Sequence, residues 1–99
     1  MAYKVRMTAS AERDLDGIAA YILTELGNPQ AARHVLDEVD ALIHVLAETL
    51  NAYAACTHPL LQGHRKAAFM RYVMIYKVAG DMVYVERFFS ELEDYAHKL

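Results

Sequence analysis

Two consecutive amphipathic segments with a very short connection constrain the fold of this chain more than any other feature. In both segments, apolar residues recur at the spacing that places them on one face of a helix. They are Leu15, Ile18, Ala19, Ile22, Leu23 and Leu26 in the first segment, and Ala32, Val35, Leu36, Val39, Leu42, Ile43 and Leu46 in the second. Two helices joined by so few residues must fold back on each other. The sequence therefore predicts an antiparallel helical hairpin.

The residues at the ends of the two segments support this hairpin. Thr8 or Ser10 can cap the first helix, and acidic residues follow in its first turn, where the helix dipole favours them. Gly27 can adopt the left-handed conformation that ends a helix, Asn28 can cap the second helix, and Pro29 suits its first position.

Strand-forming runs lie before and after the hairpin. Residues 3–7 alternate apolar and basic side chains, which predicts a half-buried strand. Residues 51–66 contain Pro59 and Gly63 and show no period, so we expect mostly loop there. The later β-rich runs are 67–70, 72–78 and 82–89, with an Ala-Gly-Asp turn at 79–81.

The alternation in the last strand predicts which of its residues face the helices. Val83, Val85 and Phe89 share one parity and are expected on the helix side, although Arg87 interrupts that apolar set. After the strand, Ser90 and a glutamate three residues later form a capping-box pattern. A short C-terminal helix is expected to present Leu92, Tyr95, Ala96 and Leu99 on one face.

This order of elements predicts an α+β fold. Residues 1–99 form one domain, because 99 residues suffice for one core but not for two. We expect an antiparallel sheet of three to four strands, with the N-terminal helical hairpin packed on one face and a short helix at the end.

Composition excludes several functional classes. The lone Cys56 rules out an internal disulfide and a cysteine-cluster metal site, so a reducing cytoplasm is the expected location. No apolar run approaches the roughly 20 residues that would span a bilayer, and the N-terminus lacks a signal peptide's apolar stretch. We expect no membrane association, no metal and no cofactor.

Charge is unevenly distributed along the chain. The formal net charge is −3, which is unfavourable for general binding to polyanions. Residues 64–77, however, hold five of the potential cations and no acidic residue. Any contact with nucleic acid must therefore depend on this local basic stretch.

The order of the elements and several short motifs resemble the RelE/ParE superfamily of bacterial toxin proteins, which includes plasmid stabilisation proteins. The motifs are TASAERDLDGIAAYI after the first strand, LGNPQAA between the helices, HPL at 58–60, GHRK at 63–66, RYVMIYKV at 71–78, and VYVERFF followed by ELEDY, which ends at Tyr95. Together they cover nearly the whole chain. The resemblance implies a toxin of a type II toxin–antitoxin system that is neutralised by a cognate antitoxin protein.

The resemblance implies two alternative targets. RelE-like members cut mRNA on the ribosome without a metal ion, using the 2′-hydroxyl of the RNA as nucleophile, whereas ParE-like members bind and block DNA gyrase. If the chain is a ribonuclease, its site residues would be Arg65, Lys66, Arg71 and Arg87 on phosphate, with Tyr95 or His97 in proton transfer and Glu86 as a base.

Several positions depart from the ribonucleolytic pattern. Many of those relatives end with a motif like His-x-Arg-Arg-Asp-Tyr, and here Ser90, Leu92 and Glu93 replace the histidine and both arginines. Only Asp94 and Tyr95 match. These departures favour a toxin that inhibits growth by binding a target such as DNA gyrase. The alternatives are a ribosome-dependent mRNA endonuclease and a decayed toxin that survives as an antitoxin-binding module.

The cationic residues also have a purely structural interpretation. Arg65, Lys66 and Arg71 can lie at a strand edge or loop, where positive charge discourages pairing with another sheet. Arg87 can be an ordinary surface charge beside Glu86.

Overall fold

The computed structural model describes residues 3–48 and 55–98. Its helices and strands are β1 (Lys4–Met7), α1 (Ala9–Thr24), α2 (Pro29–Glu48), β2 (His64–Phe69), β3 (Tyr72–Ala79) and β4 (Met82–Ser90). Two short 3-10 turns, η1 (Pro59–Leu61) and η2 (Tyr95–His97), complete the described elements.

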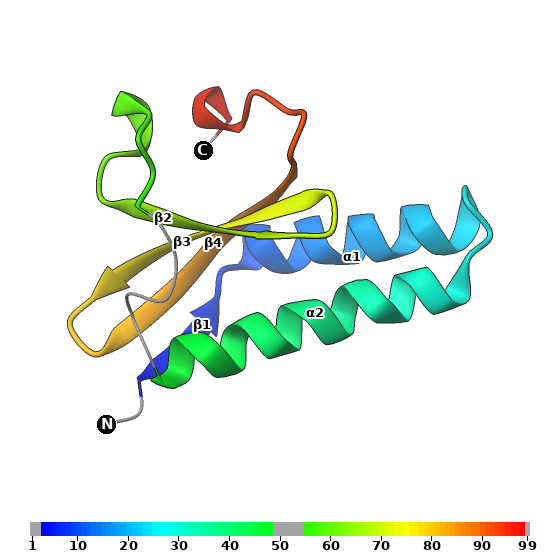
Figure 1. Cartoon of the computed structure of the whole chain (residues 1–99), viewed down its shortest axis with the longest axis horizontal. Coiled ribbons are helices and arrows are strands. Elements are labelled where there is room, and N and C mark those ends of the chain that lie inside the picture. Colours follow the sequence, from blue (N-terminus) through cyan, green and yellow to red (C-terminus); the bar gives the residue numbers. More distant parts are fainter. Residues whose placement is uncertain (1–2, 49–54, 99) are drawn as a thin grey trace.

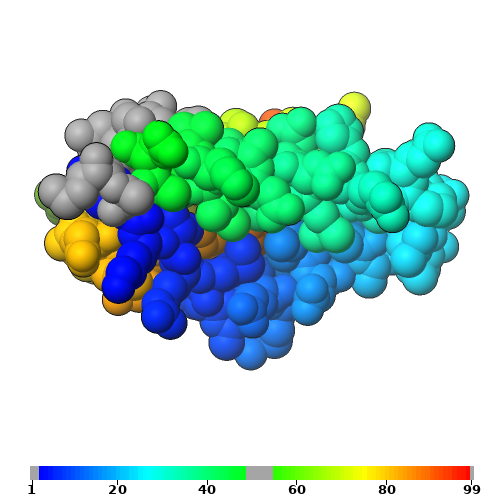
Figure 2. Space-filling view, turned by 90° about the horizontal axis from the view of Figure 1, so that it is seen from below, coloured from blue at the N-terminus to red at the C-terminus, as the bar shows by residue number. Residues whose placement is uncertain are grey.

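The helical hairpin packs on one face of a four-stranded sheet whose strand order is β1-β4-β3-β2 (Figure 1). The turns η1 and η2 lie on the other side of the sheet, beside each other. Seen from the helix side, α1 and α2 form a continuous layer, and their connected ends project beyond the rest of the molecule (Figure 2). The predicted α+β class and helical hairpin are confirmed. None of the described helices combines the length and the apolar character needed to cross a membrane.

The expectation of a fully antiparallel sheet needs one correction. β2 with β3 and β3 with β4 are antiparallel, but β1 pairs with β4 in parallel, from Lys4 opposite Met82 to Met7 opposite Val85. A parallel pair requires a long crossover connection, and here everything between β1 and β4 supplies it. The sheet is therefore mixed.

The predicted helix ends are confirmed. The Thr8 hydroxyl accepts a hydrogen bond from the backbone N–H of Ala11 at 3.0 Å and caps α1. Gly27 has φ +57° in the connection, and the Asn28 side chain accepts from the N–H of Ala31 at 3.0 Å. Local capping chemistry thus fixes where both helices begin.

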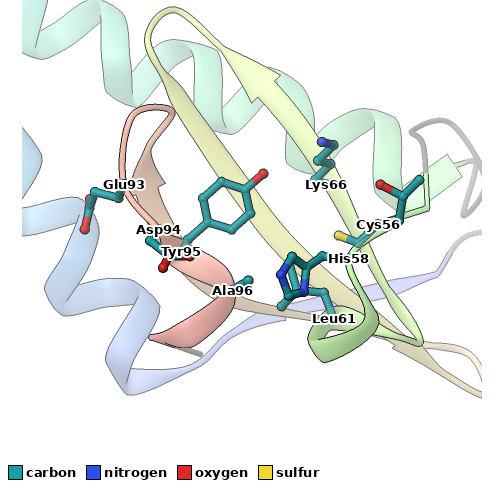
Figure 3. A pocket seen from close by; sticks show the side chains of 9 residues that line it. Cys56, His58, Leu61, Lys66, Glu93, Asp94, Tyr95 and Ala96 are labelled. Carbon is teal, nitrogen blue, oxygen red and sulfur yellow. The ribbon is translucent and has the colours of Figure 1, made fainter.

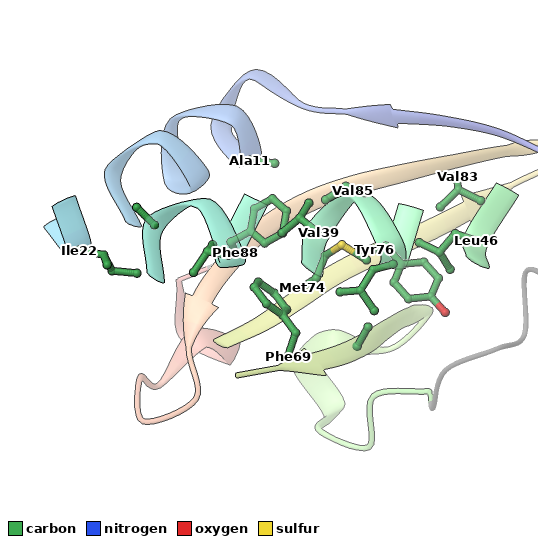
Figure 4. Close-up of a cluster of buried hydrophobic side chains, with 14 residues drawn as sticks. Ala11, Ile22, Val39, Leu46, Phe69, Met74, Tyr76, Val83, Val85 and Phe88 are labelled. Atoms are coloured by element: carbon green, nitrogen blue, oxygen red, sulfur yellow. The ribbon is translucent and has the colours of Figure 1, made fainter. Parts of the chain in front are cut away.

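The main core lies between the helical hairpin and the sheet (Figure 4). The buried positions of the helices come largely from the predicted stripes: Ile22, Ala32, Val35, Val39, Leu42 and Leu46. The sheet contributes Ala67, Phe69, Met74, Tyr76, Val83, Val85 and Phe88. No charged or polar residue is buried among the described residues.

A β-bulge changes the alternation in β4 and corrects one prediction. Ile75 pairs with Arg87 and Tyr76 pairs with Val85, so Glu86 is an extra residue between them. Val83 and Val85 face the helices as predicted. Phe89, however, packs on the opposite face, because the extra residue reverses the parity of every position after it.

The segment before β3 is more ordered than its sequence suggests. β2 begins at His64, three residues before the predicted strand, and η1 starts at Pro59 within the predicted loop. Residues 51–54 of that predicted loop lie outside the described residues.

The predicted C-terminal helix is replaced by turns and η2. Glu93 does bond back to the backbone N–H of Ser90 at 2.8 Å, so half of the capping box forms. No α-helix follows, because too short a segment cannot offset the cost of helix nucleation without burial. Leu92 is 90% exposed rather than docked, and residue 99 lies outside the described part. We call residues 91–98 the C-terminal arm.

Candidate functional site

The sheet face opposite the helices carries a second, smaller hydrophobic cluster. Val73, Ile75 and Phe89 are buried there, and Cys56 and Tyr95 pack against them. The Tyr95 ring stacks on Phe89 with centroids 5.8 Å apart and an interplanar angle of 19°. This contact holds the C-terminal arm over the sheet.

A pocket of about 250 Å³ opens between the C-terminal arm and the η1 loop, the segment from Cys56 to Leu61 that contains η1 (Figure 3). The Tyr95 ring extends from the arm toward Lys66 on β2, and Cys56 and His58 come from the facing loop. Thr57, Leu61, Glu93, Asp94 and Ala96 complete the lining. We call this the arm pocket.

The acidic residues of the arm pocket are already paired. Glu93 accepts from Lys98 Nζ at 2.8 Å and from the Ser90 N–H, and these bonds lower the pKa of its carboxyl group. Asp94 contacts Nδ1 of His97 at 2.9 Å. Lys66 has no ion-pair partner within the described residues. Its positive charge is therefore available to a ligand in the pocket.

The other titratable side chains of the pocket have structural roles. Nδ1 of His58 accepts the backbone N–H of Leu60 at 3.1 Å, which caps η1. The His58 ring also meets His97 edge-on at 5.7 Å and joins the loop to the arm. Burial raises the pKa of the Cys56 thiol, with a smaller opposing effect from Lys66, so the thiol is a poor nucleophile.

The structure separates the predicted site residues. Lys66 and Tyr95 line the same pocket. Arg65 alternates along β2 with the same period as the buried Ala67 and Phe69, and it pairs with Tyr76 of the main core. It therefore lies on the helix side of the sheet. Arg71 lies in the β2–β3 turn, in a different hollow beside Ile22 of α1.

Arg87 is committed to an internal ion pair. Its Nε and Nη2 donate to the two carboxylate oxygens of Asp14 at 2.6 and 3.1 Å, and Nη1 donates to the carbonyl of Lys98 at 3.3 Å. The guanidinium also lies 4.7 Å from the centroid of the Phe89 ring. The hydrogen bond to Asp14 raises the pKa of Arg87. Arg87 thus joins α1, β4 and the C-terminal arm.

The remaining candidates are also dispersed. His97 sits at the edge of the arm, bound to Asp94, and Glu86 lies at the bulge in another hollow with Thr8 and Ser10. Of the seven residues predicted for phosphate contact and proton transfer, the structure therefore brings only Lys66 and Tyr95 together in the arm pocket.

Sequence reasoning missed the role of Asp14. In the sequence Asp14 is only one of several acidic residues in the first half of α1, but its carboxylate accepts the backbone N–H of Phe88 at 3.0 Å. That N–H lies beyond the end of the β1–β4 ladder, so Asp14 satisfies a strand edge that no neighbouring strand reaches. Nothing local in the sequence signals a contact across 74 residues.

Comparisons with solved structures show the same fold in toxin–antitoxin proteins. A chain of a chromosomal ParDE system from P. aeruginosa aligns at a TM-score of 0.72 and 19% identity, covering 90% of this chain and 96% of that chain. A chain of the RelBE2 toxin–antitoxin complex from Mycobacterium tuberculosis aligns at 0.66 and 22%, covering 91% and 99%. YafQ from E. coli aligns at 0.56 and 17%, covering 90% and 93%. At these identities the likeness concerns the fold alone.

Comparison with protein families is more specific. A search of curated proteins finds no match. The family model described as the ParE toxin of the type II toxin–antitoxin system parDE matches residues 5–95, which include both helices, all of the sheet except Lys4, and the start of the C-terminal arm. The chain therefore belongs to the ParE toxin family of type II toxin–antitoxin systems.

Proposed function

We propose that this toxin inhibits growth by binding DNA gyrase in the cytoplasm without chemistry of its own, and that a cognate antitoxin holds it inactive. The family match supports the toxin class. The single observation that supports a non-catalytic mode of action is that the predicted phosphate-binding arginines lie apart from one another. Arg65, Arg71 and Arg87 lie in three different environments, and none lines the arm pocket.

Cleavage of RNA through a 2′-hydroxyl needs a base, an acid and cations around one phosphate. The arm pocket offers Lys66 as its available cation, and two carboxylates, Glu93 and Asp94, also line it. Carboxylates so close to a phosphate would oppose the charge that builds up in the transition state. Binding a protein target requires only a complementary surface and no such set of groups.

The two segments that flank the arm pocket carry exposed leucines. Leu60 in η1 is 56% exposed, and Leu92 in the C-terminal arm is 90% exposed. Apolar side chains that protrude from a polar surface are typical anchors of protein–protein interfaces. We assign these two leucines to the target-binding surface.

The experiment is controlled expression combined with a supercoiling assay. We expect growth arrest with a DNA-damage response and intact transcripts, and inhibition of purified gyrase. Leu60→Glu with Leu92→Glu should abolish both effects. Leu23→Glu, at a 49% exposed position on α1, serves as the matched control. Intact gyrase activity in the presence of folded, growth-inhibiting protein would refute the proposal.

An mRNA endonuclease is the second candidate, and the shared pocket of Lys66 and Tyr95 favours it. Under this alternative, induction would produce codon-phased cuts in mRNA. Lys66→Ala and Tyr95→Phe would each remove those cuts while leaving the fold intact. If the wild-type protein produces no growth arrest at all, the chain is a decayed toxin.

A further inference from the structure

One row of side chains crosses all four strands of the sheet. Arg6 of β1 pairs with Tyr84 of β4, which in turn pairs with Lys77 of β3. Lys77 then pairs with His64, the first residue of β2. Residues paired across strands project from the same face of a sheet, so these four side chains are neighbours. We call them the cross-strand row.

The burial of the adjacent residues places the row on the sheet face opposite the helices. The residues that flank Arg6 in β1 and Tyr84 in β4 pack against the main core on the helix side. Because successive residues of a strand face opposite ways, Arg6 and Tyr84 point away from the helices. Lys77 follows two residues after Ile75, which belongs to the smaller cluster on that face. Arg6, Tyr84 and Lys77 are all exposed.

The row collects cations from distant parts of the chain. β2 and β3 form a hairpin, so His64 and Lys77, the two ends of the basic stretch at 64–77, lie side by side. Arg6 joins them from the opposite edge strand. Lys4 lies two residues before Arg6 on the same face, and Lys66 lies two residues after His64, opposite Ile75. The row is therefore flanked by a further lysine on each edge strand.

The positive charge on this face is not compensated by ion pairs. Asp81 in the β3–β4 turn and Glu86 at the bulge adjoin the row, but neither forms an ion pair with its cations. Lys66 and Lys77 are diagonal neighbours across β2 and β3, where like charges repel. Such a grouping does not favour the folded monomer and indicates an external anion. Within the described residues, none of the following cations forms an ion pair: Lys4, Arg6, Lys66 and Lys77.

Protection of the sheet edges explains only part of this pattern. Lys4 and Arg6 lie on the edge strand β1, where cations discourage pairing with another sheet. Lys77, however, lies on β3, which has a strand on each side. Edge protection therefore does not account for the cation in the middle of the row.

The dimensions and chemistry of the row suit a phosphate backbone. Strands lie about 4.8 Å apart, so the row spans about 14 Å, or about four phosphates along one strand of duplex DNA. Arginine, lysine and tyrosine are all common partners of phosphate oxygens. Single strands bind instead to platforms of several stacked aromatic rings. The row holds one tyrosine, Tyr84, which is only 36% exposed, so its composition favours the backbone of a duplex.

We propose that the cross-strand row binds the sugar–phosphate backbone of duplex DNA. Arg6 and Lys77 contact phosphates, and the hydroxyl group of Tyr84 donates a hydrogen bond to a phosphate oxygen between them. Lys4 and Lys66 extend the contact on either side. Phosphates are the same at every base pair, so the contact has no sequence preference. It is weak by itself, because the chain carries a net charge of −3.

The position of the row relates this contact to the proposed target. DNA gyrase acts on duplex DNA, and η1 and the C-terminal arm, which carry Leu60 and Leu92, lie on the same side of the sheet as the row (Figure 1). A toxin that binds gyrase through these leucines therefore presents the row on the same side. The proposal rests on the proposed function only in taking gyrase-held DNA as the source of the duplex.

Binding of free DNA to the purified full chain tests the proposal directly. The probe is a labelled duplex of about 20 base pairs, which is longer than the row, and fluorescence anisotropy measures its affinity. Four phosphate contacts predict that the logarithm of the association constant falls with the logarithm of the salt concentration with a slope of about −3.6. Absence of binding at low salt, or a slope near zero, would overturn the proposal.

Variants of the toxin locate the contact. Arg6→Gln with Lys77→Gln should weaken binding about tenfold at low salt and reduce the size of the slope by about 2. The matched control is Arg13→Gln with Arg33→Gln, which removes the same charge from exposed positions on α1 and α2. The control should change the affinity less than about threefold. If both double variants reduce the slope equally, the DNA does not bind at the row and the proposal fails.

Two competitors identify the class of ligand. They are a single-stranded RNA of the same sequence and a polyglutamate peptide of equal charge. Each should displace the labelled duplex at least about threefold less well than unlabelled duplex does, because the duplex has the higher linear charge density. Stronger competition by the RNA would assign the row to RNA, and equal competition by polyglutamate would assign it to an acidic protein surface. Either result would overturn the proposal.

Thermal unfolding tests whether the row serves the fold instead. Lys77→Gln removes the repulsion with Lys66, so it should raise the Tm by about 1–2 °C at low salt. The gain should vanish as salt screens the charges. A lower Tm in this variant would show that Lys77 stabilises the monomer, which would count against the proposal.

Assays with gyrase distinguish this proposal from the proposed function. Arg6→Gln with Lys77→Gln should bind gyrase normally in the absence of DNA, but inhibition of supercoiling should require at least about threefold more of this variant. Leu60→Glu with Leu92→Glu should lose gyrase but keep its affinity for the free duplex. If the wild-type protein does not bind gyrase, the proposed function falls, while the duplex measurements still decide whether the row binds DNA.

Discussion

The two faces of the sheet are built in contrasting ways. The helix-covered face holds a continuous core that both helices and three of the strands share. On the opposite face, the buried cluster of the described residues is much smaller and consists of Val73, Ile75 and Phe89, which lie beneath the loop that contains η1 and an arm without regular α-helix. The contrast indicates that one face supplies most of the stability, which leaves the other free to carry exposed side chains for recognition.

The largest effect should come from the helix-covered face. Leu46→Ala removes a fully buried side chain from α2 and leaves a cavity, so we expect a loss of about 3 kcal/mol in the free energy of unfolding. Urea unfolding measures it. Val45→Ala, on the same helix but 41% exposed, should change stability by less than about 0.5 kcal/mol. Equal effects of the two variants would show that α2 does not carry the core.

The junction of the two faces should be the next most sensitive point. Asp14→Ala removes both hydrogen bonds from Arg87 and the one from the Phe88 N–H, which should cost about 2 kcal/mol, because charged hydrogen bonds in a partly buried setting are strong. Thermal unfolding measures the change. Asp16→Ala, at an exposed position on the same helix, is the matched control. If Asp14→Ala lowers the stability no more than Asp16→Ala does, Asp14 does not have this structural role.

A smaller effect is expected on the open face. Tyr95→Ala removes the stack on Phe89, which should cost about 1 kcal/mol and release the C-terminal arm. Hydrogen exchange should speed up in residues 91–98 but not in α2. Faster exchange throughout the molecule would mean that the arm belongs to the main cooperative unit, contrary to the comparison of the two faces.

The smallest effect concerns pH and is confined to the arm. The pKa of Glu93 is lowered from its ordinary value of 4.5, so the contacts of this carboxylate stabilise the fold fully when the pH is above that value. That stabilisation is lost as the pH falls through the lowered pKa. An NMR titration should show the ring signals of Tyr95 moving in that acidic window, and Glu93→Gln should abolish the change. Persistence of the change in Glu93→Gln would assign it to another carboxyl group.

Sequence reasoning succeeded where the determining interactions are local. The helical stripes, the Thr8 cap and the Gly27–Asn28 connection all depend on residues within a few positions of each other. It failed where partners are distant along the chain. The parallel pairing of β1 with β4 joins segments that lie far apart in the sequence, and no short pattern encodes it.

The same limit explains the outcome at the site. Period-two counting placed Phe89 on the wrong face, because a single extra residue at Glu86 reverses the alternation and leaves no clear signal in the sequence. Arg87 was a candidate phosphate ligand, but its partner Asp14 lies 73 residues earlier. Lys66 and Tyr95 were named for a shared site, and the fold does place them in one pocket.

The parallel pairing of β1 with β4 has a consequence for synthesis of the protein. The helical hairpin can form early during translation, but β1 must wait for β4, which is the last of the strands to leave the ribosome. Such distant pairing also slows folding. We therefore expect a nascent toxin to acquire protease resistance only when Ser90 has emerged, which limited digestion of stalled chains of increasing length can measure. The newly made protein would then remain inactive until nearly all of its chain has been translated.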